Sequence, residues 1–220
     1  FSSFNPYDFG IISYLHSQND ILAAGGEVIS FSVSIGLPYS EKKIEKFYLE
    51  YFMKGIQSQS NIDKSIRASG HSYQTNEPGI TINMNGEIVH QSKKNQAVEG
   101  DLIYLSKPLG TGYLLASYFE NSNQLNVEDL KVLKYWLKKG NLQVVNIARK
   151  FGSKIMTDIS GFGLASHLSD ICRASKVSAE INLINTLLIN DNLELLNKYK
   201  STGFENNYQS SSLNVEVKGK

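Results

Sequence analysis

The stretch Thr157-Asp158-Ile159-Ser160-Gly161-Phe162-Gly163-Leu164 places a carboxylate and two glycines directly before residues 164–174, whose apolar positions recur at helical spacing. The short apolar segment 154–157 precedes it, so the pattern predicts a strand, a glycine turn and a helix. A helix start presents free backbone N–H groups that attract phosphate, and an adjacent Asp can hold the magnesium ion that accompanies phosphate. The simpler alternative is that Asp158 or Ser160 caps the helix and that the glycines only turn the chain.

The composition excludes several classes of protein. The 220 residues suffice for one large domain or two small ones without disulfides or structural metals. Because 22 Lys and Arg balance 21 Asp and Glu, the net charge is +1, and we expect no nucleic-acid and no membrane partner. The hydrophobic content of 41% argues against global disorder. No apolar run approaches the roughly 20 residues that a membrane-spanning helix needs.

The cysteine content and the first residue carry two further expectations. Cys172 is the only cysteine, which excludes an internal disulfide and a cysteine-rich metal site. This usage is typical of a reducing compartment, so we expect a cytoplasmic location. Its position on the 164–174 helix indicates a packed side chain rather than a nucleophile. The sequence begins at Phe1 without a methionine, which indicates a processed product or part of a longer protein.

Hydrophobic periodicity predicts a mixture of helices and strands in both halves of the chain, which favours an α/β or α+β protein over a bundle or a sandwich. Helices are expected at residues 10–24, from about 40 to 56, and at 113–119, 127–139, 141–151 and 164–174. Strands are expected at residues 28–35, 66–71, 80–84, 101–105, 154–157 and 179–183.

Breaker residues predict where these elements end. Gly36 and Pro38 should end the first strand, and Gly70-His71 and Asn85-Gly86 should form turns. The polar segment 91–100 reads as a linker, so we expect two domains, 1–95 and 96–220. The Ser- and Asn-rich residues 206–212 are expected to be loop or disordered.

Other residues could bind phosphate or metal. The loop Lys107-Pro108-Leu109-Gly110-Thr111-Gly112 repeats the order of strand, glycine loop and helix but is not a Walker loop, and a simple turn is the alternative. Asp20 lies inside an otherwise apolar helix, so it should have a magnesium ion or a basic side chain beside it unless it faces solvent. His71 could donate to a phosphate or sit in a turn. The remaining histidines show no metal-binding spacing.

Five collinear segments together resemble the selenide, water dikinase (selenophosphate synthetase) family, within the superfamily of aminoimidazole ribonucleotide synthetase. The form of the 157–168 segment and the KPLGTG loop resemble this family more than its relatives in the superfamily. The segments are Asn-Pro-Tyr-Asp-Phe-Gly at 5–10, Asn-Asp-Ile-Leu-Ala-Ala-Gly-Gly at 19–26, Gly-His-Ser at 70–72, Gly-Asp-Leu-Ile-Tyr-Leu-Ser-Lys-Pro-Leu-Gly-Thr-Gly at 100–112, and residues 157–168.

The resemblance implies a two-domain fold, α/β plus α+β, with an incomplete N-terminal part. It also implies a homodimer that makes selenophosphate from selenide, water and ATP and releases AMP and phosphate. Asp20 and Asp158 match carboxylates that bind magnesium ions on the ATP phosphates. Gly70, His71 and Ser72 match a segment that contacts ATP bound mainly by the other subunit. The phosphate-loop candidates from the residue patterns are Gly110, Thr111, Gly161 and Gly163.

Some features of the family have no counterpart among residues 1–220. These are a glycine-rich segment with a Cys or selenocysteine nucleophile, a Lys and two further magnesium-binding Asp residues, so we assign no catalytic nucleophile here and expect residues 1–220 alone to be inactive. His16 stands where the family has Asn, and Met84 where glycine is usual. A non-catalytic ATP-binding or dimerisation relative, or an ATP-dependent enzyme with another substrate, are the alternatives.

Overall fold

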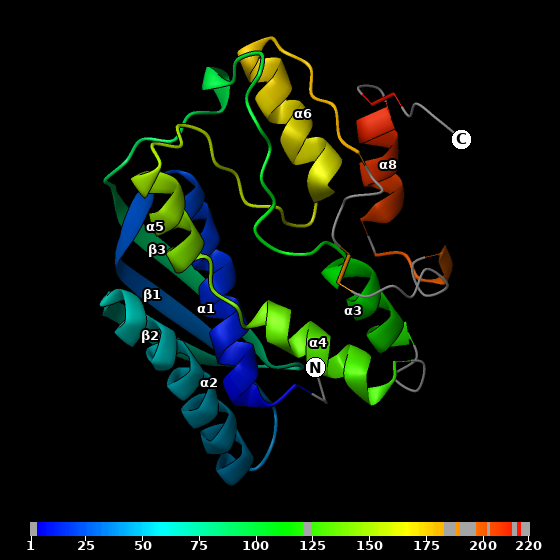
Figure 1. The fold of residues 1–220 in the computed structure, drawn as a ribbon. Helices are drawn as coiled ribbons and strands as arrows, with labels where there is room; N and C mark the ends of the chain where they lie inside the picture. Colours follow the sequence, from blue (N-terminus) through cyan, green and yellow to red (C-terminus); the bar gives the residue numbers. More distant parts are fainter. Residues whose placement is uncertain are drawn as a thin grey trace. The chain divides into compact units, whose positions relative to one another are not determined.

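The computed structural model describes residues 4–120, 125–182, 188–189, 197–201, 203–212 and 215–216 (Figure 1). The chain divides into two units. The first contains Phe1–Ser92 and Gly140–Met156, and the second contains Lys93–Lys139 and Thr157–Lys220. Within the described part of the chain, no helix is both long and apolar enough to cross a membrane.

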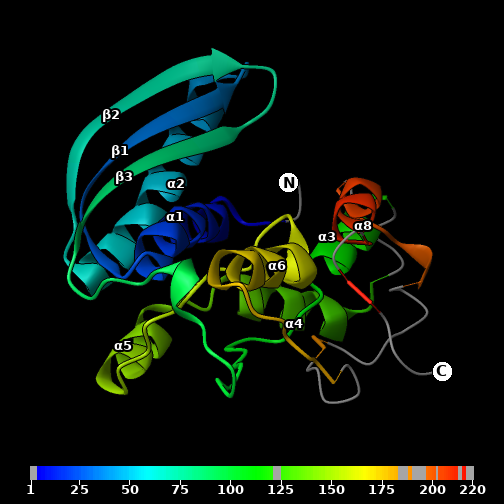
Figure 2. The same cartoon turned by 90° about the horizontal axis from the view of Figure 1, so that it is seen from above.

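A three-stranded sheet of order β2-β1-β3 forms the frame of the first unit. The central strand β1 (Gly26–Pro38) pairs parallel with β2 (Ile66–Thr75) and antiparallel with β3 (Gly79–Ile88). Helices α1 (Pro6–Ala23) and α2 (Lys42–Asp63) lie on one face of this sheet (Figure 2). Both β2 and β3 are therefore edge strands of the described sheet.

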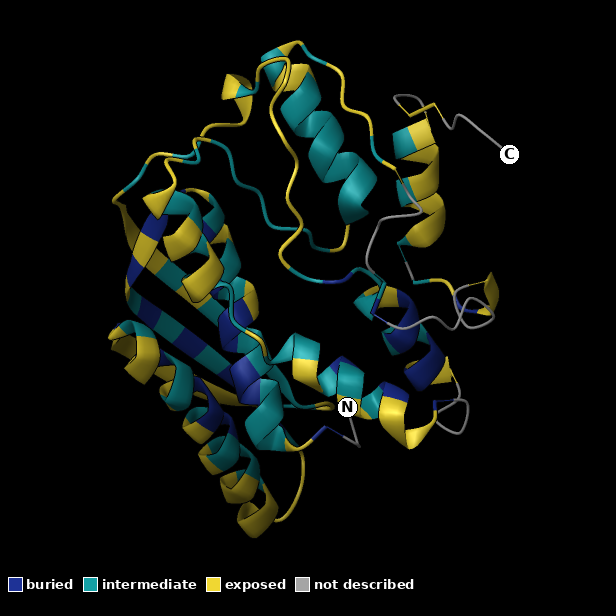
Figure 3. Cartoon of the chain, in the orientation of Figure 1, coloured by how far each residue is buried: buried dark blue, intermediate teal, exposed yellow. Residues whose placement is uncertain are grey.

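The alternation of apolar and polar residues along β1 decides which face is buried. Phe31, Val33 and Ile35 are each at most 3% exposed and pack with Tyr14 of α1 and residues of α2. The serines between them are only partly buried, because successive side chains of a strand point to opposite faces. Figure 3 shows the resulting buried stripes on β1, α1 and α2.

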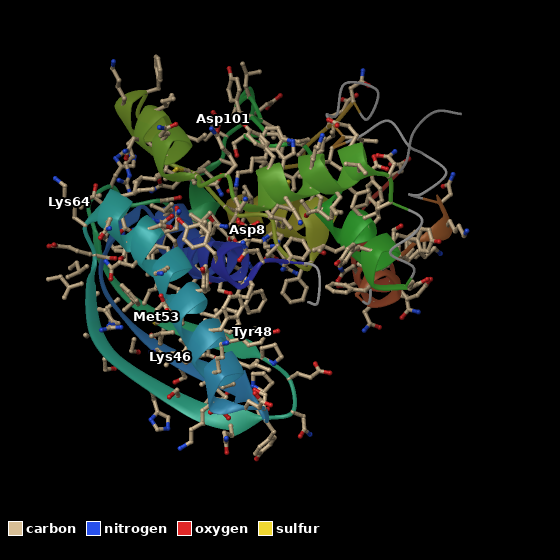
Figure 4. The ribbon with its side chains drawn as sticks, turned by 90° about the horizontal axis from the view of Figure 1, so that it is seen from below. Asp8, Lys46, Tyr48, Met53, Lys64 and Asp101 are labelled. Carbon is tan, nitrogen blue, oxygen red and sulfur yellow. The ribbon has the colours of Figure 1, made fainter. Side chains whose placement is uncertain are left out.

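Local signals fix the two helices. Pro6 occupies the first turn of α1, where its missing N–H costs nothing, and Asn5 caps the helix by accepting from the Tyr7 N–H at 2.9 Å. Lys64 adopts a left-handed conformation, φ 62°, and ends α2 (Figure 4).

A segment from the middle of the chain returns to the first unit. It carries α5 (Leu142–Lys150), whose Arg149 donates through Nη2 to the Gly26 carbonyl at 2.7 Å and through Nη1 to Glu27 at 3.1 Å. After α5, the Ser153 carbonyl of the same segment accepts a hydrogen bond of 2.6 Å from His90 Nε2. Side-chain and backbone hydrogen bonds therefore hold this segment, since none of the residues of α5 is fully buried.

The second unit is mainly helical among the residues described. After the short 3-10 helix η1 (Lys94–Gln96), its helices are α3 (Thr111–Glu120), α4 (Val127–Leu137), α6 (Gly163–Ser175) and α8 (Phe204–Ser212). The helices expected from periodicity are thus present, although α2 continues to Asp63, beyond the expected end at residue 56, and the other ends are displaced by a few residues.

Three expected strands are not formed where the chain is described. Residues 101–105, 154–157 and 179–182 have no strand pairing, and residue 183 lies outside the described residues. A strand needs a hydrogen-bonded neighbour as well as an apolar run, and no described residue pairs with these segments. Leu102 and Tyr104 are accordingly 76% and 86% exposed.

The predictions made from glycine, proline and Ser/Asn-rich segments were also wrong. The expected turns at Gly70-His71 and Asn85-Gly86 lie inside β2 and β3, and β1 continues through Gly36 to Pro38. Sheet pairing on both sides of β1 outweighs the local preference of these residues. Residues 206–212, expected to be loop or disordered, belong to α8, where Phe204 and Tyr208 stack one helical turn apart with ring centroids 6.3 Å apart.

Candidate nucleotide and metal site

The segment Thr157–Gly163, called the glycine strap from here on, leads into α6 of the second unit. Its residues form no helix or strand before Gly163, the first residue of α6. Gly163 has φ +74°, which favours glycine, and its N–H donates to the Ser160 carbonyl at 3.1 Å. The strap therefore brings Asp158, Gly161 and Gly163 together at the start of a helix.

The Asp158 side chain is partly buried, and its carboxylate has no hydrogen-bond or ion-pair partner among the described residues. An unpaired carboxylate beside a helix start is an available oxygen ligand for a hard cation such as Mg²⁺. Neither Asp158 nor Ser160 donates or accepts as a side-chain cap of α6, so the simple capping alternative is not what the structure contains.

His167 of α6 holds the strap from the helix side. The Ser160 N–H donates to His167 Nε2 at 3.4 Å, so Nε2 carries no proton and the neutral ring must carry its proton on Nδ1. Nδ1 can then donate to Thr157 Oγ1 at 3.5 Å, and Thr157 Oγ1 donates to the Asp158 carbonyl at 3.2 Å. This role of His167 was not predicted from the sequence. The spacing could have indicated it, because His167 follows Gly163 by four residues, which places its side chain over the first turn of the helix.

Asp20 lies in the first unit, in the last turn of α1. Asp20 is exposed, so its charge is not buried and needs no partner to offset a cost of burial. Of the two alternatives raised by the sequence, the structure shows the one in which Asp20 faces solvent. The last turn of α1 contains no basic residue, so no side chain of that turn offsets the carboxylate charge at the negative end of the helix dipole. A bound cation would relieve this unfavourable placement. The neighbouring Asn19 accepts from Asn141 Nδ2 at 2.9 Å, while the buried Asn141 Oδ1 has no partner.

Gly70, His71 and Ser72 are exposed along the edge strand β2. His71 lies opposite Ser34 of β1 in the parallel register. A Cβ at Gly70 would meet only ordinary contacts with Val33, at 3.5 Å or more, so packing does not require glycine there. The three residues are thus available to a ligand or to another chain.

The segment 107–112 lies in the second unit, and its last two residues, Thr111 and Gly112, are the first residues of α3. Gly110 has φ +122°, and a Cβ there would lie 2.4 Å from the Tyr113 ring, so only glycine fits. The Lys107 ammonium donates to the Lys139 carbonyl. Burial, followed by the nearby charge of Lys139, lowers the pKa of Lys107 to about 8.

Two free carboxylates are candidate ligands for magnesium. Among the described residues, no group of three or more His, Cys, Asp and Glu side chains gathers as a metal site. Mg²⁺ commonly takes one or two protein carboxylates and completes its shell with phosphate oxygens and water. Asp20 and Asp158 each offer one free carboxylate in its own unit, and this chemistry fits a magnesium ion delivered with a nucleotide.

Comparison with known proteins shows which protein family is similar to this chain. Residues 1–88 match the N-terminal domain and residues 98–205 the C-terminal domain of the AIR synthase related proteins. The selenide, water dikinase of Photobacterium profundum is 32% identical over 180 residues, which are 81% of this chain and 51% of that protein. The enzyme of the same name from Haemophilus ducreyi is 33% identical over 186 residues, again 81% and 51%. The chain spans about half the length of these relatives.

Solved structures agree on the fold. Thiamine monophosphate kinase of Aquifex aeolicus superposes with a TM-score of 0.75 at 22% identity, covering 92% of this chain and 68% of that one. The hydrogenase maturation protein HypE of E. coli gives a TM-score of 0.62 at 14% identity, covering 76% and 52%. The two domain matches, the curated relatives and the shared fold agree, and the chain belongs to the AIR synthase related family, with its similarity to curated proteins lying among the selenide, water dikinases.

Proposed function

We propose that the protein carrying this chain makes selenophosphate from selenide, water and ATP and releases AMP and phosphate. One phosphoryl group of ATP passes to selenium and the other to water, so two P–O bonds of ATP break while one Se–P bond and one P–O bond form. The observation that carries the proposal is the glycine strap with the free carboxylate of Asp158, in a chain whose curated relatives have this name.

The residues of this chain have holding roles in that reaction. Phosphoryl transfer needs positioning and charge neutralisation more than covalent chemistry from the protein. Magnesium ions, when bound, offset the negative charge of the phosphates, and Asp20 and Asp158 would each serve as a ligand to such an ion. Backbone N–H groups of Gly161, Gly110 and Thr111 are the proposed phosphate donors, together with that of Gly163 once it leaves the Ser160 carbonyl.

A homodimer is the second part of the proposal. We assign residues 1–95 to ATP binding and dimer formation and residues 96–220 to the C-terminal domain, and we keep the expectation of a cytoplasmic location. Support comes from β2, an edge strand on which Gly70, His71 and Ser72 are exposed and can reach ATP held by a second copy.

The decisive experiment measures products. The natural gene product, incubated with ATP, selenide and Mg²⁺, should yield selenophosphate and AMP in equal amounts by ³¹P NMR and chromatography. Asp158→Asn and Asp20→Asn should each weaken Mg²⁺-dependent ATP binding at least tenfold, whereas Glu50→Gln, which changes an exposed carboxylate paired with Lys54, should not. Mg²⁺-dependent binding that survives both Asp substitutions would overturn the metal assignment.

Two alternatives have specific support. His16 and Met84 depart from the family pattern, which favours a non-catalytic ATP-binding or dimerisation relative. Structures named as a thiamine monophosphate kinase and a hydrogenase maturation protein share the fold, which favours another substrate. ATP binding without selenide turnover by the natural protein would support the first. Release of ADP in place of AMP would support the second.

A further inference from the structure

The glycine strap has no hydrogen-bond ladder of its own. Residues 153–160 form no regular secondary structure, and Gly161 is exposed with open space where a Cβ would stand. Glycine without neighbours has wide backbone freedom, so the position of Asp158 depends on whatever holds the strap from outside.

Helix α8 supplies one such contact. The Asn207 Nδ2 donates to the Gly161 carbonyl at 2.6 Å, although the two residues are 46 positions apart. The fit is close, because a Cβ on Gly203 would lie 3.3 Å from Asn207 Nδ2 and 3.6 Å from the Gly161 carbonyl oxygen. Asn207 thus reaches the turn between Asp158 and the first residues of α6.

Helix α6 supplies the opposing contact. His167 accepts from the Ser160 N–H at 3.4 Å, one residue before Gly161. A cavity of about 380 Å³ lies beside these contacts and is lined by Phe162 of the strap, by residues of α6 that include Ser166 and His167, and by Asn206 and Asn207 of α8. The strap is therefore held at Ser160 from α6 and at Gly161 from α8.

We propose that Asn207 is a positioning residue that, opposite His167, fixes the glycine strap in the conformation in which Asp158 and the first N–H groups of α6 can receive a magnesium–nucleotide. The proposal rests on the proposed function for the identity of the ligand. The clamp itself is a property of the chain without ligand. Replacing a residue that hydrogen-bonds to a metal ligand, or to the backbone beside it, typically weakens metal binding about 10- to 100-fold.

Two matched substitutions test the clamp. Asn207→Asp keeps the shape of the side chain but replaces the donor with a carboxylate, which repels the Gly161 carbonyl. Asn206→Asp adds the same charge to the same turn of α8, at an exposed residue that lines the cavity but makes no hydrogen bond to the described residues of the strap. Amide hydrogen exchange without ligand should become at least fivefold faster at Ser160 and Gly163 in Asn207→Asp and stay unchanged in Asn206→Asp. Equal exchange in the two variants would overturn the clamp whatever the protein binds.

Binding measurements connect the clamp to the site. Isothermal titration with Mg²⁺ and a non-hydrolysable ATP analogue should give about tenfold weaker binding for Asn207→Asp than for Asn206→Asp. Adding Gly161→Ala, for which the Cβ space is open, should recover part of the loss by reducing backbone freedom. Faster exchange with undiminished binding would overturn the positioning role. Absence of binding in the unaltered protein would overturn the proposed function, while the exchange result still decides the clamp.

Discussion

The phenol of Tyr14 in α1 donates a hydrogen bond of 2.6 Å to Oδ2 of Asp63, the last residue of α2. The same carboxylate oxygen accepts from Gln18 Nε2 at 2.7 Å. Since the phenol gives its only proton to Asp63, the Ser65 hydroxyl, 2.6 Å away, must donate to Tyr14. This network connects the first helix to the end of the second and to the start of β2.

Replacing Tyr14 should destabilise the first unit. Tyr14→Phe keeps the ring, which packs edge-on against Phe31, and removes the hydroxyl from a fully buried side chain. It leaves Ser65 without its acceptor and Asp63 with one donor fewer, so we expect a loss of about 1–3 kcal/mol in the free energy of unfolding. Urea denaturation followed by circular dichroism measures it. Tyr39→Phe, at a 66% exposed tyrosine, is the control and should change little.

The same residue predicts the response to alkaline pH. Burial, and next the hydrogen bond to Asp63, raise the pKa of Tyr14 above its ordinary value of 10.0. The unfolded chain then loses the Tyr14 proton near pH 10 while the folded chain keeps it. The stability from this group is complete below pH 10 and is lost as the pH rises above it. The difference in unfolding free energy between the unaltered protein and Tyr14→Phe should therefore shrink from pH 8 to pH 11, and a constant difference would contradict the assignment.

The close crossing of α1 and α2 gives a third prediction. A Cβ on Gly55 would lie 2.1 Å from the Tyr7 carbonyl oxygen and 3.0 Å from the Ile11 nitrogen, both backbone atoms. Gly55→Ala must therefore push the helices apart, and we expect a loss of about 1–3 kcal/mol despite the better helix propensity of alanine. Gly79→Ala meets nothing within 4 Å and is the matched control. Equal melting temperatures for the two variants would show that the helices do not cross this closely.

The sequence predicted the parts of the fold that depend on local pattern. The alternation along β1 and the helical spacing of α2 each carry their own signal, because one face of each element is buried. Residues 101–105 also form an apolar run, but the strand expected there is absent. A strand needs a pairing partner, and the local pattern does not show whether a partner is present. The return of residues 140–156 to the first unit depends on polar contacts such as Arg149 with Gly26, which have no periodicity.

The site divides in the same way. Asp158, Gly161 and Gly163 are contiguous, so their common place before a helix could be read directly from the sequence. The contact of Asn207 with Gly161 could not, since a Ser- and Asn-rich segment favours a loop by composition. The helix that forms there is supported by ring stacking and by contacts with α6, which appear only in the folded unit.

The amine of Lys107, in the glycine loop before α3, should lose its proton at a lower pH than an ordinary lysine. Partial burial lowers its pKa to about 8 from the ordinary 10.5, and the charge of Lys139 adds to the effect. Between these pH values the folded chain holds the amine neutral while the unfolded chain keeps it protonated. The unfolded chain binds more protons there, so the unfavourable contribution of this amine, complete below pH 8, is relieved as the pH rises to 10.5.

The titration can be observed at the side chain itself. With ¹³C-labelled lysine, the Cε signal absent from Lys107→Arg should titrate with a midpoint near pH 8. Lys54 serves as the internal control, because its hydrogen bond to Glu50, 2.6 Å long, raises its pKa above the ordinary value. Adding a nucleotide should move the Lys107 midpoint upward if the loop receives phosphate, since a nearby negative charge favours the ammonium form. A midpoint above pH 10 without nucleotide would mean that the amine is solvated and does not lie against the Lys139 carbonyl.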